Sequence, residues 1–339
     1  MKSPIKFDES VTFYTSAAWP SRAKPGAWEL EIHGVIFEEE SRPLIRALGV
    51  KALRLRTELL TELECDVLRE RLKLFLVDNE RGKAVPVRVG SDVHVLPKSG
   101  ANGHFLNVLT LAGDAVAAAL RDGRIPLQAV TRPGDERQFT GAACVLPDSE
   151  DPLVISDVDD TIKITSIGNF EEVKLNTFCR PFLPVEGMAG VYQAWAEAGA
   201  GFCYVTGSPW QLYRPLEAFR ERHGFPAGPW HMKHLRFAEP ATIWAFVGTQ
   251  NEFKRQRIEP LMERWSQRPV VLVGDSSEQD PEIFAALARK HPKRVMRIFI
   301  RDVAGGTRDS DRYRKTFEGI DEAKWQLFQD AAELPRRLS

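Results

Sequence analysis

Residues 153–161 have the sequence LVISDVDDT, in which a short apolar run is followed by three carboxylates within four positions. A continuous apolar run is typical of a strand that is buried on both faces of a parallel sheet. Further apolar runs lie at residues 201–205, 270–273 and 295–300, and they alternate with helical spacing near residues 187–198, 210–222, 252–266 and 280–290. This alternation predicts an α/β domain with a Rossmann-like parallel sheet and helices on both faces.

Two of the predicted strands end in acidic clusters. Asp157, Asp159 and Asp160 follow the first strand, and residues 274–280 (GDSSEQD) follow the strand at 270–273. Ligands bind at the carboxyl ends of strands in open α/β sheets, and carboxylates crowded there repel one another unless a cation neutralises them. One acidic turn alone is typical of solvated surface, but two at one sheet edge predict a cation site. Mg²⁺ suits such an all-oxygen site.

An EF-hand loop is excluded for the first cluster, because Ile162 stands where that loop requires glycine.

A hydroxyl-rich turn follows the strand at 201–205. Thr206, Gly207 and Ser208 precede an expected helix start, where hydroxyls and backbone N–H groups can hold a phosphate. A plain helix cap by Ser208, with Pro209 at the first helical position, is the alternative.

Lys254 lies 21 positions before Asp275. Its ammonium can balance the charge of a phosphate, and the alternative is an ordinary solvated helix lysine. The sequence contains no G-x-S-x-G elbow, no P-loop, no H-E-x-x-H pair and no G-x-G-x-x-G after a strand.

The order of these features is similar to the motif set of the haloacid-dehalogenase-like phosphatases. The words SDVDDTIK (156–163), GSPWQLY (207–213) and VGDSSEQD (273–280) resemble, more narrowly, the catalytic domain of the actin-patch-type phosphatidate phosphatases, distant relatives of the lipins. The resemblance covers roughly residues 150–303, and no motif position departs from it. The N-terminal half resembles the segment preceding that domain only in its strand-rich character.

The resemblance implies a chemical role for four residues. Asp157 is the implied nucleophile, which forms an aspartyl-phosphate, and Asp159 is the implied acid and base. Lys254 is implied to offset phosphoryl charge, and Thr161 to orient the loop.

The resemblance also implies two groups of binding residues and a Mg²⁺ cofactor. The implied phosphate-binding residues are Thr206, Gly207 and Ser208. The implied Mg²⁺ ligands are Asp157, the backbone carbonyl of Asp159, and Asp275, with Asp280 as a ligand or a support.

The N-terminal half is predicted to be rich in β-strands. Residues 28–37 are typical of a half-buried strand, residues 72–89 predict a hairpin, and further strands are expected near residues 93, 105–111, 127–131 and 138–145. Residues 41–70, in which Ser41 can cap a helix with Pro43 in its first turn, have helical spacing.

We therefore expect five parts along the chain. They are an extension (1–25), a β-sandwich-like domain with a helical insertion (26–147), a linker (148–152), a haloacid-dehalogenase-like phosphatase domain without a large cap (153–303), and a charged tail with one helix near residues 321–334 (304–339).

Composition narrows the function classes. The 339 residues contain 46 Lys and Arg against 47 Asp and Glu, so nothing points to nucleic acid as a partner. The four cysteines include no C-x-x-C pair, which favours a reducing compartment. The sequence contains no run of eighteen apolar residues, so no membrane-spanning helix is predicted. These patterns predict a cytoplasmic protein.

The spacing of the motifs bears on the substrate. Only about forty-five residues separate Thr161 from Thr206, and a similar number separate Thr206 from Lys254, so no folded cap is expected. An open site favours a phosphate on a large or membrane-bound molecule, and we expect phosphatidate, with peripheral membrane contact. Residues 165–184 are either a flap that contacts lipid or a packed crossover loop.

Two other functions stay open. The same machinery can act on another phosphomonoester, or the domain can bind phosphatidate without turnover; the presence of Asp159 disfavours the latter. The sequence does not fix the oligomeric state.

Overall fold

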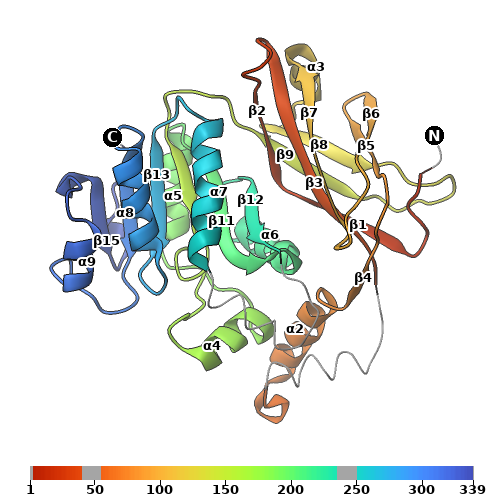
Figure 1. The fold of residues 1–339 in the computed structure, drawn as a ribbon. Helices are drawn as coiled ribbons and strands as arrows, with labels where there is room; N and C mark the ends of the chain where they lie inside the picture. The colour runs from red at the N-terminus through yellow and green to blue at the C-terminus, as the bar shows by residue number, and fades with distance from the viewer. Residues whose placement is uncertain (1–2, 40–54, 235–249, 339) are drawn as a thin grey trace. The chain divides into compact units, whose positions relative to one another are not determined.

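The computed structural model describes residues 3–39, 55–234 and 250–338, which form two compact units (Figure 1). Within this part of the chain, the first unit contains residues 3–39, 73–148 and 228–230, and the second contains the rest. The units change over between Asp148 and Ser149.

The first unit is built on a nine-stranded sheet with the order β1-β3-β2-β9-β8-β5-β6, and β4 and β7 also pair with β3. Its strands are β1 (Glu9–Tyr14), β2 (Ser16–Pro20), β3 (Ala27–Glu39), β4 (Val77–Asn79), β5 (Pro86–Val89), β6 (Asp92–Val95), β7 (His104–Ala112), β8 (Arg124–Ala129) and β9 (Thr140–Val145). The short helix α3 (Gly113–Ala119) follows β7. The strands predicted from residue 28 to 37 and from residue 93 onward are confirmed.

The long strand β3 organises this sheet, because it pairs with β7 along one edge and with β1 and β2 along the other. A Cβ atom at Gly34 would lie 2.4 Å from the Phe105 ring and 2.7 Å from the Thr12 carbonyl oxygen, so the crowded crossing requires glycine. Buried apolar side chains from β1, β3, β5, β7, β8 and β9 share one core.

Two expectations for the N-terminal half are wrong in detail. Residues 1–25 are not an extension outside the sheet, because β1 pairs with β3 and β2 lies between β3 and β9. The hairpin at 72–89 does not form: β4 pairs with β3, while β5 pairs with β6 and β8. Hydrogen bonds join all nine described strands into one sheet, and whether that sheet is sandwich-like stays a prediction.

The predicted helical insertion is described only in its second part. Residues 57–59 form the 3₁₀ turn η1 (Thr57–Leu59), and the helix α2 (Glu62–Lys73) follows, with residues up to 72 assigned to the second unit. The predicted helix start at Ser41 and Pro43 lies outside the described residues.

The second unit is an α/β domain, as predicted. Its sheet has the order β12-β11-β10-β13-β14-β15, and the pairs from β11 to β15 are parallel. The strands are β10 (Leu153–Ser156), β11 (Gly201–Pro209), β12 (Trp230–Lys233), β13 (Val270–Asp275), β14 (Val295–Arg301) and β15 (Trp325–Phe328). Every residue of β10, β11 and β13 is buried, which explains their unbroken apolar runs.

Helices cover both faces of this sheet, with α7 and α8 on one face and α5 on the other (Figure 1). α5 connects β10 to β11 on one side of β10, and α7 connects β12 to β13 on the other side. Because these two crossovers run in opposite directions across the sheet and crossovers are right-handed, they place α5 and α7 on opposite faces. The helices are α4 (Phe170–Lys174), α5 (Met188–Glu197), α6 (Tyr213–Arg222), α7 (Gln250–Arg264), α8 (Asp280–Lys290) and α9 (Asp311–Thr316).

Residues 304–339 do not form a tail with a helix at 321–334. Trp325 begins the parallel edge strand β15, and its ring stacks on Phe317 with centroids 4.1 Å apart. Burial of this aromatic pair against β14 favours a strand over the predicted helix.

No helix in the described part of the chain is long and apolar enough to cross a membrane.

Candidate active site

The first acidic cluster and the second lie side by side because β10 and β13 are parallel neighbours. Ser156 is in register with Val273, and the backbone N–H of Asp157 donates to the Val273 carbonyl at 2.8 Å. Asp157 therefore leaves β10 at the level where β13 ends in Gly274 and Asp275. β10 is also where the chain direction across the sheet reverses, the usual place for a site in this architecture.

Three carboxylates converge there. Asp157, Asp275 and Asp280 are buried, and each offers an oxygen within 4.8 Å of the other two. Burial, followed by the negative charges of neighbouring carboxylates, raises the pKa of Asp275 well above its usual range. Burial raises the pKa of Asp157 in the same direction, although Lys254 opposes it. Three buried carboxylates this close together destabilise the folded state unless a cation neutralises them.

Gly274 permits the close approach of the third carboxylate. A Cβ atom at this position would lie 2.3 Å from Oδ2 of Asp280, so any other residue would push Asp280 away. The Asp275 carboxylate is held from one side only: its Oδ1 accepts from the backbone N–H of Ser277 at 2.7 Å, while its buried Oδ2 has no hydrogen-bond partner.

These observations fit a bound divalent metal. A buried carboxylate oxygen without a partner is expensive, and three convergent carboxylates are the oxygen donors that Mg²⁺ prefers. Asp157, Asp275 and Asp280 are the residues that would hold it.

Lys254 provides the positive charge of the site. It comes from α7, is 1% exposed, and its Nζ lies 2.9 Å from Asp157, 2.6 Å from Asp280 and 3.1 Å from Glu278. Burial alone would lower its pKa, but these carboxylates outweigh that effect and raise it well above the usual value, so the side chain is an ammonium. The alternative of a solvated helix lysine is wrong.

Glu278 is a site residue that the sequence reasoning did not select. Burial, with Asp280 acting in the same direction, raises its pKa to about 7, while Lys254 opposes the shift. The only sequence signal is its position in the word GDSSEQD, between two predicted ligands.

Asp159 does not join the group of three carboxylates. Its Oδ1 lies 2.8 Å from Nζ of Lys163 and accepts from Thr165 at 2.7 Å. Its Oδ2 accepts from the hydroxyls of Thr206 at 3.0 Å and Ser208 at 2.8 Å. Burial would raise the pKa of Asp159, but Lys163 and the hydroxyls of Thr165 and Ser208 lower it to about 2.

The predicted phosphate-binding turn is therefore in contact with Asp159. β11 continues to Pro209, and the 3₁₀ turn η3 (Trp210–Leu212) that follows has no side-chain cap, so the alternative in which Ser208 caps a helix is wrong. Thr161, the remaining motif residue, donates from Oγ1 to Oδ2 of Asp157 at 3.1 Å.

Asp160 shapes the loop that carries these residues. It has a left-handed backbone (φ 54°), and its carboxylate accepts from the backbone N–H groups of Thr165, Ser166 and Ile167 at 2.6–2.7 Å. Its carbonyl accepts from Arg301 at 2.7 Å. The three carboxylates after β10 thus each contact a different set of residues, and their spacing in the sequence does not reveal this difference.

The segment 165–184 is largely packed. It contains α4 and a π-helical turn η2 (Leu175–Cys179), and both Phe178 and Phe182 are buried. Arg180 is held by Glu64 and Glu172, at 3.0 and 2.7 Å. Two large apolar side chains of this segment face solvent, Phe170 at 49% exposure and Leu183 at 58%. The contacts favour the crossover-loop alternative for most of it.

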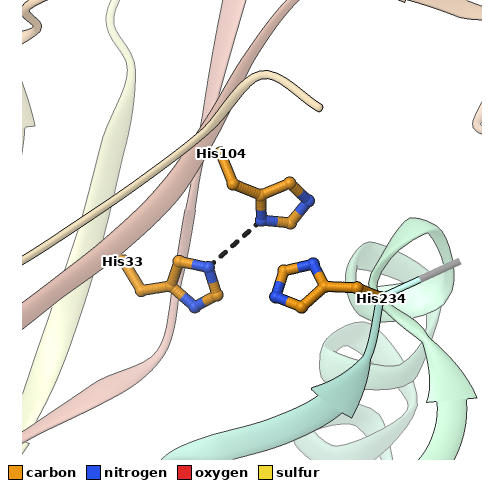
Figure 2. A group of neighbouring side chains, drawn as sticks. All are labelled: His33, His104 and His234. Atoms are coloured by element: carbon orange, nitrogen blue, oxygen red, sulfur yellow. Dashed lines mark hydrogen bonds between the residues drawn. The ribbon is translucent and has the colours of Figure 1, made fainter. Parts of the chain in front are cut away.

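A histidine pair in the first unit is drawn in Figure 2. His33 and His104 come from β3 and β7, their ring nitrogens are 3.1 Å apart, and Tyr14 packs against both rings. Two imidazoles fall short of the three or four protein ligands of a typical zinc site, so we regard the pair as packing. The third histidine drawn, His234, belongs to the second unit.

The match to a known protein family concerns the second unit. Residues 152–302 match the family described as "Phosphatidate phosphatase APP1, catalytic domain". The match covers less than half of the chain, so it shows that this segment is similar to that catalytic domain. The resemblance seen in the three motif words is thereby confirmed, over nearly the same residues.

Two curated proteins are similar to part of this chain. Phosphatidate phosphatase APP1 of Saccharomyces cerevisiae is 30% identical over 152 residues, and an uncharacterised protein of Schizosaccharomyces pombe is 30% identical over 154 residues. Each match covers 44% of this chain and 25% of the relative, so the chain matches about a quarter of the length of these proteins.

Among solved structures, an apo phosphoserine phosphatase aligns with a TM-score of 0.32 and 10% identity, over 53% of this chain and 96% of that one.

Proposed function

We propose that this protein is a Mg²⁺-dependent phosphatidate phosphatase of the haloacid-dehalogenase-like type, which converts phosphatidate and water to diacylglycerol and phosphate. One observation carries the proposal. Within the segment that matches the phosphatidate phosphatase family, Asp157, Asp275 and Asp280 converge at the carboxyl ends of β10 and β13, and the ammonium of Lys254 contacts Asp157 and Asp280.

In the proposed first step, a carboxylate oxygen of Asp157 attacks phosphorus. The bond from phosphorus to the lipid oxygen breaks, and the leaving alkoxide takes a proton from Asp159. Thr161 and Lys254 contact the two oxygens of Asp157 and so fix the direction of attack. Bound Mg²⁺ would neutralise the nucleophile and the phosphoryl oxygens so that they can approach each other.

In the second step, Asp159 takes a proton from water, which attacks phosphorus and breaks the bond to Asp157. Inorganic phosphate leaves, and the Asp157 carboxylate is restored. Thr206 and Ser208 lie beside Asp159, which supports a role for this turn in holding the phosphoryl oxygens during both steps.

We place this activity in the cytoplasm at a membrane surface. The family match names phosphatidate, a membrane lipid, as the substrate of the relative. Between Thr161 and Thr206 the chain forms only α4, η2, α5 and the start of β11, which supports a site without a large cap on that side.

The test is phosphate release from phosphatidate in mixed micelles, with and without Mg²⁺. We expect metal-dependent release that falls by at least about a thousandfold in Asp157→Asn, equivalent to about 4 kcal/mol in activation free energy. Asp311→Asn is the matched control, because its carboxylate is 80% exposed and lies on α9.

A soluble aryl phosphate separates the remaining functions. Hydrolysis of the aryl phosphate alone would support the mechanism and refute phosphatidate as the substrate. Binding of phosphatidate vesicles without release from either compound would replace the enzyme with a binding module.

A further inference from the structure

The loop between β13 and α8 carries much of the candidate site. Ser277 donates to Asp275, Glu278 contacts Lys254, and Asp280 begins α8. The conformation of this loop therefore decides whether the carboxylates keep the spacing that a cation requires.

Arg312, which lies outside the segment matched by the family, makes several contacts with this loop. Arg312 donates to the carbonyl oxygen of Ser276 at 2.6 Å through Nη1 and to that of Glu278 at 2.6 Å through Nη2. Its Nε and Nη2 also donate to the carboxylate of Glu282, at 2.8 and 3.0 Å. The guanidinium thus ties both ends of the loop to the first turn of α8, a fork geometry that lysine does not offer.

The position of Arg312 is itself fixed. It lies on α9, where the next residue, Tyr313, is buried beside Trp325, and Phe317 stacks on the same indole. Arg289 of α8 donates to the Thr316 and Glu318 carbonyls at the end of α9. The segment that the sequence suggested was a tail therefore presents Arg312 from a packed platform.

We propose that Arg312 is a positioning residue for the candidate site, which holds residues 276–278 so that Asp275, Glu278 and Asp280 keep their spacing. The path runs from the guanidinium to the Glu278 carbonyl, from the Glu278 carboxylate to Lys254, and from Lys254 to Asp157. The identity of the ion as Mg²⁺ rests on the proposed function. The contacts by which Arg312 fixes residues 276–278 do not depend on that function. Residues 303–339 then belong to the functional unit, although the family match ends at residue 302.

The test compares Arg312→Ala with Arg314→Ala. Arg314 lies on the same helix, is 66% exposed and pairs with Asp311, so its loss alters charge equally without touching the loop. Isothermal titration calorimetry measures Mg²⁺ affinity, and hydrogen exchange measured in EDTA reports the protection of residues 274–282.

We expect Arg312→Ala to weaken Mg²⁺ binding about tenfold to a hundredfold, the usual effect of losing a group that orients metal ligands. The Ser277 amide should exchange faster, and Arg314→Ala should change neither quantity. A folded Arg312→Ala protein with wild-type Mg²⁺ affinity and wild-type exchange would overturn the proposal.

Arg312→Lys serves if the alanine variant fails to fold. An ammonium cannot bridge two carbonyls and a carboxylate at once, so an intermediate loss is expected, and wild-type values would again refute the role. If the wild-type protein binds no Mg²⁺, the proposed function fails, and hydrogen exchange alone decides the role of Arg312.

Discussion

The Asp275→Asn variant should be more stable than wild type when no metal is present. In the presence of Mg²⁺, the same variant should be less stable than wild type. Asparagine keeps the Oδ1 acceptor that Ser277 uses, and it removes the charge and the unpartnered oxygen at Oδ2. The substitution thus relieves repulsion in the metal-free state and deletes a ligand in the bound state.

The magnitudes follow from the spacing. Two unit charges separated by the 4.8 Å limit for this cluster repel by about 3.5 kcal/mol at an effective dielectric constant of 20. Lys254 offsets part of this repulsion, so we expect a net gain of about 1–2 kcal/mol in EDTA. Mg²⁺ at 100 times its Kd stabilises wild type by about 2.7 kcal/mol.

Thermal melting in EDTA and in Mg²⁺ measures both effects. With about 2–4 °C per kcal/mol, the variant should melt about 2–8 °C above wild type in EDTA, and Mg²⁺ should raise the wild-type Tm by about 5–10 °C. Asp311→Asn, an exposed carboxylate on α9, should show neither effect. A lower Tm for Asp275→Asn in EDTA, or an equal response to Mg²⁺, would refute the reasoning.

Three further predictions concern other contacts. Lys163→Met should lower kcat at least about tenfold with little change in KM, because Lys163 holds Asp159 at 2.8 Å; steady-state kinetics that show only a raised KM would contradict this. Burial alone would raise the pKa of Glu9, but Lys83 and Lys6 lower it from its usual 4.5. The stability advantage of wild type over Glu9→Gln should therefore be full above pH 4.5 and shrink as the pH falls below that value. Urea unfolding at pH 7 and pH 3 measures this advantage, and an equal advantage at both pH values would rule out the ion pairs of Glu9 with Lys6 and Lys83 as its source. Trp325→Ala should cost about 3–5 kcal/mol, because the indole is 7% exposed and stacks on Phe317; a loss below about 1 kcal/mol by urea unfolding would show that β15 does not depend on this packing.

The strands that build the candidate site could be predicted because their burial on both faces leaves a pattern in the sequence. The apolar residues of β10 and β13 are fully buried, and their parallel register brings the two acidic ends together as the motif order suggested. Lys254, selected from its place in the motif order, contacts Asp157 and Asp280, and its role in the site stays a prediction.

The missed features depend on contacts that no local pattern records. Trp325 is a strand residue because Phe317 and β14 cover it, whereas the charged residues around it favour solvent exposure. β4 pairs with β3, more than 35 positions away in sequence, instead of forming the local hairpin that the flanking turn favoured. Arg312 contacts its loop across 34 to 36 positions, and no spacing rule connects them.

The pKa values of Asp157 and Asp159 shift in opposite directions, because the two side chains contact groups of different charge. Asp157 faces Asp275 and Asp280, so its ionised form is disfavoured unless Lys254 and a cation compensate. Asp159 faces Lys163 and three hydroxyls, so its ionised form is favoured.

Such a separation suits a nucleophile that needs a cation beside it, and it keeps Asp159 ionised, although a carboxylate with so low a pKa is a weak proton acceptor. The acid half of the proposed cycle demands more, because a carboxyl with a pKa of about 2 holds no proton near neutral pH. Thr206 and Ser208 belong to the turn proposed to hold the phosphoryl group, so a bound phosphate would draw their hydroxyls from Asp159. Loss of those two hydrogen bonds makes the ionised form of Asp159 less favourable. The same event that brings the substrate in would therefore raise the proton affinity of the residue that must protonate the leaving group.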